Sequence, residues 1–285
     1  MIEPEILEEL TELLGEAPRV IVPLAGATSS KVYRLELADR ELILRLFLAE
    51  RWDADAEALS TREHVILSAL AGRGLPAPHP VATLPGNGVL MTVLPGRVVL
   101  PERPDARWLD RMAALLQQIH ACGASVPYAY ESWNDVRDDQ PPPAWWRDAD
   151  LWTAARQLAR NEPAYEPLFT HRDYHPVNLL WEGERISGVV DWINACMGPP
   201  GVDVAHCRAN LAIMYGLDVS QAFLQAYARH AVGYVHEPYW DVDVAFSALP
   251  DVVPYPPWAE FGLHTLTAEM ARRRLEAFVR AAVGE

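Results

Sequence analysis

Basic residues are few in this sequence, and lysine is nearly absent. Lys31 is the single lysine among 285 residues, and 24 basic residues stand against 39 acidic ones, which gives a formal net charge of −15. A surface with this balance repels polyanions, so the composition argues against nucleic acid and anionic lipid as partners. The charge permits a cationic ligand but does not by itself indicate one.

Cysteines and long apolar runs are also few. The three cysteines, Cys122, Cys196 and Cys207, are scattered and form neither a pair with metal-binding spacing nor a disulfide framework. No run of about 18 apolar residues predicts a membrane span. The acidic start, residues 1–5, lacks the basic and apolar segments of a signal peptide. We therefore expect a protein of the reducing cytoplasm with no membrane partner.

The first third of the chain predicts a sheet-rich lobe. Short runs of Val, Ile and Leu between turn residues are typical of antiparallel strands, and apolar residues at helical spacing predict two helices. The strands are expected at residues 19–24, 31–37, 41–48, 80–84 and 89–94, and the helices at 4–15 and 54–71. Gly86-Asn87-Gly88 is a hairpin signal between the last two strands.

The break at Leu94-Pro95-Gly96 predicts a boundary between an N-terminal lobe (1–94) and a C-terminal lobe (95–285), with a hinge at about 91–97. The second lobe is expected to be mostly helical, with an irregular excursion at 123–149 and an interruption at the proline-rich stretch 250–257. Helices are predicted at 105–122, 150–160 and from 202 onward, and brief strands at 168–171, 178–181 and 186–190. The predicted class is α+β.

The segment from His171 to Asp191 carries the strongest functional signal. Asp173 and Asn178 stand five residues apart, and Asp191 follows thirteen residues after Asn178. Phosphoryl transfer needs a carboxylate that orients the attacking hydroxyl, and amide and carboxylate oxygens that hold magnesium. The spacing therefore predicts Asp173 as the catalytic base and Asn178 and Asp191 as magnesium ligands.

Two other interpretations of this segment remain open. His171, Asp173 and His175 could ligate zinc or iron in a metal-dependent hydrolase, although no further His-rich motif stands ready to complete such a site. A nucleotide-binding regulatory module of the pseudokinase type is the other alternative. His171 itself is more often a packed structural residue than a catalyst.

The sequence from His171 to Leu180, together with Val189-Val190-Asp191-Trp192, resembles the aminoglycoside phosphotransferase family of protein-kinase-like small-molecule kinases. The resemblance implies a bilobal protein-kinase-like fold, with a five-stranded antiparallel N-terminal sheet, one main helix and a mostly helical C-terminal lobe. It implies ATP and Mg²⁺ as cofactors, with Asp173, Asn178 and Asp191 in the roles given above. It also implies that Asp203 and His171 support the catalytic loop, and an N-cap role for Asp203 is compatible with that.

The nucleotide is expected in the N-terminal lobe, but not in a P-loop, because no Gly-x-x-x-x-Gly-Lys-Ser/Thr occurs. The loop at 26–30 offers backbone N–H groups and the hydroxyls of Thr28, Ser29 and Ser30 to phosphate oxygens. Arg45 places a charge inside an apolar strand, where the kinase pattern has lysine, and Glu63 is its expected helix partner. In the resembled fold the backbone of the hinge contacts adenine, and the resemblance implies that Thr92 C=O and Leu94 N–H are the matching groups here.

The phosphate acceptor is expected to be a small molecule with a free hydroxyl, such as an aminoglycoside-like antibiotic, another amino alcohol or a sugar. The second lobe is rich in aromatic and acidic residues, which would suit a cationic amine or a stacked sugar ring. The sequence thus predicts an ATP- and Mg²⁺-dependent phosphotransferase, with antibiotic resistance as one role of that class. It makes no prediction of oligomeric state.

Overall fold

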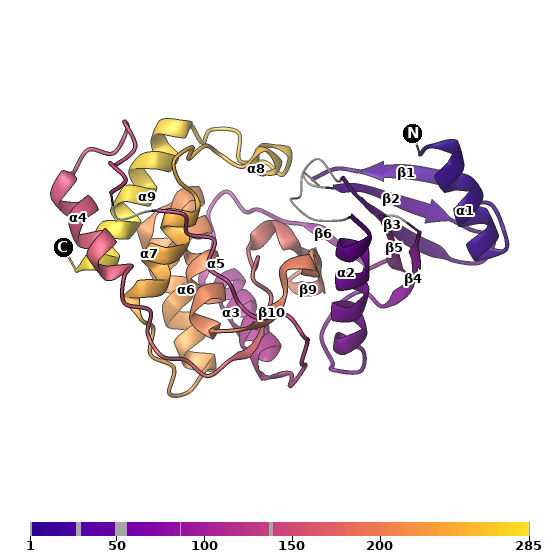
Figure 1. The fold of residues 1–285 in the computed structure, drawn as a ribbon, viewed down its shortest axis with the longest axis horizontal. Helices are drawn as coiled ribbons and strands as arrows, with labels where there is room; N and C mark the ends of the chain where they lie inside the picture. The colour runs from indigo at the N-terminus through magenta and orange to yellow at the C-terminus, as the bar shows by residue number, and fades with distance from the viewer. Residues whose placement is uncertain (1, 27–29, 49–55, 86, 137–138, 285) are drawn as a thin grey trace.

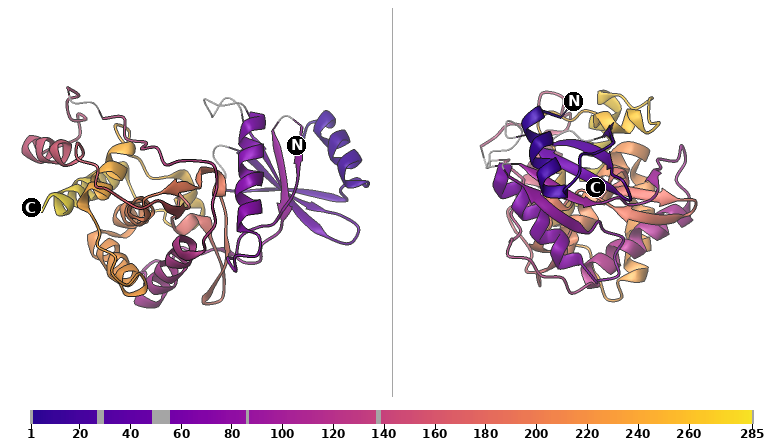
Figure 2. Two further views of the ribbon diagram at one scale, coloured as in Figure 1. Left: turned by 60° about the horizontal axis from the view of Figure 1, so that its bottom comes forward. Right: turned by 90° about the vertical axis from the view of Figure 1, so that its right-hand side faces the viewer.

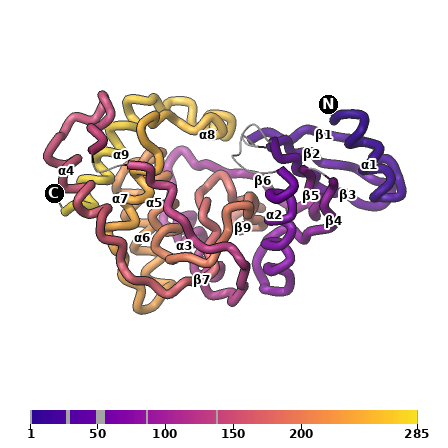
Figure 3. The backbone as a smooth tube through the Cα atoms, in the orientation of Figure 1, coloured from indigo at the N-terminus to yellow at the C-terminus, as the bar shows by residue number. Residues whose placement is uncertain are grey.

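The computed structural model describes residues 2–26, 30–48, 56–85, 87–136 and 139–284. A sheet-rich N-lobe and a larger helical C-lobe lie side by side along the long axis (Figure 1), and the backbone tube shows the same division (Figure 3). Thr28, Ser29, Gly86 and the predicted helix start at residues 54–55 lie outside the described residues. The predicted fold class, a protein-kinase-like α+β arrangement, is confirmed.

The N-lobe contains one antiparallel five-stranded sheet of order β1-β2-β3-β5-β4. Its strands are β1 (Val20–Leu24), β2 (Ser30–Glu36), β3 (Glu41–Phe47), β4 (Pro80–Leu84) and β5 (Gly88–Thr92). After β3 the chain forms α2 (Ala56–Leu70) and then returns to the sheet as β4. Strand β5 follows and pairs with both β3 and β4. The last strand along the chain therefore lies inside the sheet, so spatial order differs from sequence order.

Alternation along β3 decides which side chains reach the cleft between the lobes. Leu44 packs on one face with Leu10 of α1 (Pro4–Leu14), a helix that ends at Gly15 with a left-handed φ of 74°. Phe47 lies on the other face and packs with Ile66 of α2. Because side chains alternate along a strand, Arg45 is on the same face as Phe47 and points toward α2.

The C-lobe packs helices around two small sheets. One sheet pairs β7 (Leu168–Thr170) with β10 (Cys196–Gly198), and the other has the order β6-β8-β9. The remaining strands are β6 (Arg97–Val98), β8 (Leu179–Glu182) and β9 (Arg185–Val189), with one-turn helices η2 (Pro176–Asn178) and η3 (Trp192–Asn194). The helices are α3 (Ala106–Ala121), α4 (Ala149–Leu158), α5 (Pro200–Tyr215), α6 (Leu217–His230), α7 (Pro238–Ser247), α8 (Pro256–Glu260) and α9 (Ala268–Val283).

Several elements differ from the sequence prediction. The two short strands β6 and β10 were not predicted, because two or three residues give too little periodicity to detect. Helix α5 begins at Pro200, since proline is well accommodated in the first turn of a helix. Helix α8 forms at the end of the proline-rich stretch for the same reason.

The lobes are tied to each other at several points. Strand β6 leaves the linker and pairs with β8, and the backbone N–H of Val189 donates to the carbonyl of Pro76 across the interface (2.7 Å). Arg62 of α2 donates to the carbonyl of Ile193 (2.9 Å). The turned views in Figure 2 show α2 standing at this junction. In the described part of the chain, no helix is long and apolar enough to cross a membrane.

Candidate active site

Asp203, on the first turn of α5, holds the loop that carries Asp173. Its carboxylate accepts the backbone N–H groups of His171 (2.7 Å) and Arg172 (2.6 Å), and Nε2 of His120 lies 3.1 Å away. Burial would raise the pKa of Asp203, but the hydrogen bonds from His120 and the loop lower it below its ordinary value. The carboxylate therefore stays charged in a fully buried position and fixes the loop to α5. The N-cap interpretation of Asp203 was wrong, because Pro199 is the N-cap residue.

Hydrogen bonds of His171 and Tyr174 also hold the same loop in place. His171 is fully buried; its Nδ1 accepts the backbone N–H of Asp173 (3.3 Å), and its Nε2 donates to Val190 (3.0 Å). Burial lowers the pKa of His171, which keeps the ring uncharged. Tyr174 is also fully buried and donates to the carbonyl of Met112 on α3 (2.8 Å). The loop is thus anchored to β9, α3 and α5, while Asp173 is left facing the cleft.

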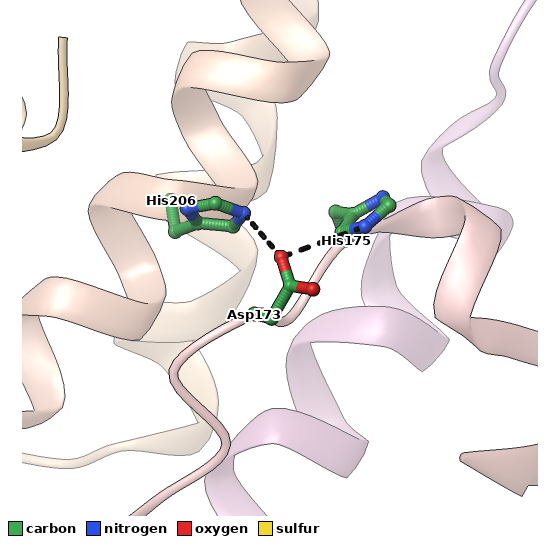
Figure 4. Close-up of side chains that lie close together, drawn as sticks. All are labelled: Asp173, His175 and His206. Carbon is green, nitrogen blue, oxygen red and sulfur yellow. Dashed lines mark ion pairs between the residues drawn. The ribbon is translucent and has the colours of Figure 1, made fainter. Parts of the chain in front are cut away.

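Asp173 lies between two imidazoles (Figure 4). Its Oδ1 is 3.0 Å from Nε2 of His206, which projects from α5, and 3.7 Å from Nε2 of His175. Burial would raise the pKa of Asp173, but the two neighbouring imidazoles lower it below its ordinary value, so it is ionised. Burial also lowers the pKa of His175 to about 4, so this ring is uncharged at neutral pH.

Asn178 and Asp191 reach the cleft from the two ends of the β8–β9 hairpin. The amide nitrogen of Asn178 donates to the backbone carbonyl of Asp173 (2.9 Å), which leaves its amide oxygen without a donor among the described residues. Asp191 has a left-handed φ of 64°, which is costly for a residue other than glycine. Only Arg172 shares that feature among the described non-glycine residues, so both strained positions fall in the predicted catalytic segment.

Arg45 is the centre of a buried charge cluster. Its Nη1 donates to Oε1 of Glu63 (2.7 Å), as the sequence predicted, and its Nη2 lies 2.7 Å from Oδ1 of Asp191. Burial would lower the pKa of Arg45, but the two carboxylates raise it above its ordinary value. The Nε atom donates to the hydroxyl of Ser30 (3.1 Å), so this hydroxyl is engaged with Arg45 instead of standing free for phosphate.

A cavity of about 330 Å³ lies between the lobes, and we call it the interlobe cavity. Arg45, Glu63 and Ser30 line it from the N-lobe, and Asn178 and Asp191 line it from the C-lobe. Thr92 and Leu94, at the end of β5, line it as well. The rest of its lining is largely apolar, for example Val32, Ile43, Met91, Val98 and Leu180. A mostly apolar cavity with a few polar groups is typical of the sites that bind small molecules and cofactors.

A second cavity of about 410 Å³ lies within the C-lobe, and we call it the C-lobe cavity. Its polar lining is mostly carboxylates, imidazoles and amides, and aliphatic side chains line it together with three large aromatic rings. The carboxylate, imidazole, amide and aromatic residues are Asp173, Asp191, Asp251, His175, His206, Asn194, Asn210, Trp133, Tyr255 and Trp258. Among the lining residues that the structure describes, none is arginine or lysine. Asp191 and Tyr255 line both cavities, so the two spaces meet at these residues.

The metal cluster expected from His171, Asp173 and His175 does not form. His171 points away from the cleft and is bonded to Val190, whereas His206, which lies more than thirty residues further along the chain, takes its place beside Asp173. The sequence interpretation missed His206 and also His120, which links Asp203 to Tyr227. His120 lies in the amphipathic helix α3 and His206 in the largely buried helix α5, and in both a histidine gives no pattern of its own. The only available signal for His206 was its place three residues after Asp203.

The arrangement defines a protein-kinase-like bilobal fold, in which the loop that carries Asp173 faces a cleft between the sheet-rich N-lobe and the helical C-lobe. The family model described as the phosphotransferase enzyme family matches residues 20–240, which is most of the chain. The protein belongs to this family, and the resemblance inferred from the catalytic segment is confirmed.

Homoserine kinases are among the curated proteins that this chain resembles. The protein from Mesorhizobium japonicum is 30% identical over 165 residues, which is 50% of this chain and 50% of the relative. The protein from Parvibaculum lavamentivorans is 25% identical over 191 residues, or 58% of each chain. The match thus spans about half the length of these relatives.

Solved structures are similar over almost the whole chain. Aminoglycoside phosphotransferase APH(4)-Ia, as a thermostable mutant in complex with AMP-PNP and hygromycin B, has a TM-score of 0.65 at 16% identity, covering 99% of this chain and 100% of the other. Macrolide 2'-phosphotransferase MphH from Brachybacterium faecium has a TM-score of 0.60 at 18% identity, covering 99% and 98%. At these identities the likeness shows the shared fold.

Proposed function

We propose that this protein is an ATP- and Mg²⁺-dependent phosphotransferase that moves the γ-phosphoryl group to a hydroxyl of a small molecule bound in the C-lobe cavity. The observation that carries the proposal is the junction of the two cavities at Asp191. Asn178 and Asp191 face the interlobe cavity, where the nucleotide is assigned, and Asp173 faces the C-lobe cavity, where the acceptor is assigned. A phosphoryl group passing between them needs to cross one shared opening.

Asp173 acts as the base in this scheme. Its carboxylate is ionised and accepts a hydrogen bond from the acceptor hydroxyl, which aims the oxygen lone pair at the phosphorus for in-line attack. The buried contacts of Asp203, His171 and Tyr174 keep the loop from moving during this step. Precise placement of this kind supplies a large part of catalysis in phosphoryl transfer.

The residues present fit magnesium. Mg²⁺ prefers hard oxygen ligands, and Asn178 and Asp191 offer an amide oxygen without a donor and a carboxylate on the cavity wall. Bound there, the ion would neutralise the charge of the nucleotide phosphates. Oδ1 of Asp191 is paired with Nη2 of Arg45 (2.7 Å), so an ion bound here would use the other oxygen of this carboxylate or share it with the guanidinium.

The lining of the C-lobe cavity supports an acceptor without a carboxylate. Homoserine carries a carboxylate, which needs a cationic partner when it is removed from water. The described lining offers three carboxylates and no arginine or lysine, and would repel such a group. Its carboxylates and aromatic rings favour a neutral or amine-bearing hydroxyl compound instead, such as an amino sugar or another amino alcohol.

A coupled assay of ADP release with an acceptor panel tests the proposal. Aminoglycosides, macrolides, amino alcohols, neutral sugars and homoserine are compared at saturating ATP and Mg²⁺, and mass spectrometry checks for a phosphorylated acceptor. We expect turnover with at least one amine or neutral compound and much less with homoserine. Homoserine as the best substrate would overturn the acceptor assignment, and nucleotide binding without turnover on any acceptor would favour the pseudokinase alternative.

The role of Asp173 as the base is tested by one conservative substitution at Asp173 and the same substitution at a control position. Asp173→Asn removes the ionised carboxylate with little change of shape, and Asp39→Asn makes the same change at an exposed turn of the N-lobe. ATP binding should persist in both proteins, because Asp173 lies on the acceptor side. Turnover should be lost only in Asp173→Asn.

A further inference from the structure

We propose that Asp173, His175 and His206 form a binding site for a zinc-type divalent ion, separate from the magnesium ligands Asn178 and Asp191. The three side chains come from two elements of the C-lobe and converge on one point of the C-lobe cavity (Figure 4). Their ligand atoms all lie within 4.8 Å of one another. Two imidazoles with one carboxylate are a common ligand set for first-row transition metals.

Two of the three separations between the donor atoms are close to those that such an ion requires, and the third, between the two imidazoles, is within 4.8 Å. Zinc binds nitrogen and oxygen donors at about 2.0–2.1 Å with tetrahedral geometry, which places two donors about 3.3 Å apart. Oδ1 of Asp173 lies 3.0 Å from Nε2 of His206 and 3.7 Å from Nε2 of His175, so the observed separations bracket that value. The C-lobe cavity beside them leaves room for water as a fourth ligand.

His175 supplies an independent sign of a missing ligand. Its side chain is only 8% exposed. Its Nδ1 is buried without a hydrogen-bond partner among the described residues, and its Nε2 lies 3.7 Å from Oδ1 of Asp173, beyond hydrogen-bond distance. A buried polar group without a partner is costly, and an ion at Nε2 would remove the part of that cost that belongs to Nε2. The Nδ1 atoms of both imidazoles have no partner to fix them, so we expect weaker binding than at a structural zinc site.

The site would discriminate between the two kinds of ion. Imidazole suits zinc, whereas magnesium prefers oxygen donors with several bound waters, as at Asn178 and Asp191. An ion at the new site would take up the Asp173 oxygen and block its approach to an acceptor hydroxyl. Inhibition of phosphoryl transfer by zinc is therefore a consequence that rests on the proposed function, whereas binding of the ion does not.

Cobalt(II) spectroscopy on the protein without nucleotide or acceptor tests the binding itself. Co²⁺ in a four- or five-coordinate nitrogen and oxygen site absorbs strongly in the visible range, so we expect a saturable band that Zn²⁺ removes and excess Mg²⁺ does not. His206→Gln keeps a side chain able to hydrogen-bond Asp173 but removes the imidazole, and should weaken binding at least about tenfold. His175→Gln should do the same.

Two controls locate the ion. His264→Gln changes an exposed histidine elsewhere and should leave the band unchanged, and Asp191→Asn alters a magnesium ligand and should also leave it. A band that persists in His206→Gln, or one lost in Asp191→Asn, would overturn the proposal, as would the lack of any band in the wild-type protein. Thermal melting of each variant verifies that it is folded.

The activity arm separates this inference from the proposed function. If the protein transfers phosphate, Zn²⁺ should inhibit the wild type, and a large excess of Mg²⁺ should not relieve it. His206→Gln should require at least about tenfold more Zn²⁺ for equal inhibition. Failure to find any acceptor leaves the cobalt result standing, and failure to bind cobalt leaves the transfer assay unaffected.

Discussion

The two cavities differ in how their charges are balanced. In the interlobe cavity Arg45 lies between Glu63 and Asp191, so positive and negative groups compensate each other within a few ångströms. The C-lobe cavity contains three carboxylates and two imidazoles with no arginine or lysine among its described lining. Asp191 lines both cavities and is compensated by Arg45, whereas Asp173 and Asp251 have no arginine or lysine partner among the described residues. The C-lobe cavity therefore keeps negative charge that a ligand can neutralise. The predictions below test this contrast.

The largest effect is expected on the acceptor side, from loss of the Asp173 carboxylate. Asp173→Asn should lower kcat by about 10²–10⁴-fold, the usual contribution of a general base, and should leave the ATP dissociation constant nearly unchanged. Steady-state kinetics and nucleotide titration measure the two quantities. A comparable loss of ATP affinity would contradict the assignment of the nucleotide to the interlobe cavity and of the acceptor to the C-lobe cavity.

The next effect is expected in the interlobe cluster. Arg45→Met should reduce the free energy of unfolding by about 3–5 kcal/mol, because it leaves Glu63 buried without a cation. Denaturant unfolding measures this loss. Adding Glu63→Gln to Arg45→Met should recover part of it, since the uncompensated charge is then removed. Equal stability of the single and double variants would contradict the cluster as the source of the effect.

A smaller stability loss is expected where the catalytic loop meets α5. Asp203→Asn keeps one acceptor oxygen and loses the other, so about 1–3 kcal/mol of unfolding free energy should disappear. Because the folded state lowers the pKa of Asp203, its contribution is present above its ordinary pKa near 4 and is lost as the pH falls through the lower folded value. Acid unfolding of Asp203→Asn should therefore depend less on pH below about 4.

The smallest effect concerns the exposed carboxylate of the C-lobe cavity. Asp251→Asn should raise KM for an amine-bearing acceptor by a few fold, in line with the weak energy of a solvent-exposed charge pair. It should not change KM for a neutral acceptor of similar size. An equal change for both acceptors would mean that Asp251 acts by shape and not by charge.

The nucleotide side of the protein was easier to predict from sequence than the acceptor side. Arg45 stands out because a charge inside an apolar strand needs a partner, and alternation along β3 points it to Glu63. Asn178 and Asp191 lie at the two ends of one hairpin, so local spacing brings them together. These features depend on the geometry of single strands and hairpins, which can be inferred from the spacing of residues in the sequence.

The acceptor side depends on contacts between distant segments. His206 reaches Asp173 only because Asp203, one helical turn earlier, is fixed by the loop. The position of β5 between β3 and β4 also follows from tertiary packing and not from chain order. Periodicity identifies a helix or strand, but it does not state which neighbour that element will meet.

The ties between the lobes restrict the path by which a nucleotide enters. The β6–β8 pairing, the bond from Val189 to Pro76 and the bond from Arg62 to Ile193 all lie on the side of the linker and α2. Gly26 and Phe261 line the cavity away from these ties, and a Cβ at position 26 would come within 3.3 Å of the Phe261 ring, so the glycine lets the two segments lie close together. Among the described residues, no hydrogen bond joins Gly26 to Phe261. ATP and ADP are therefore expected to exchange past Phe261, with the linker side acting as a fixed pivot.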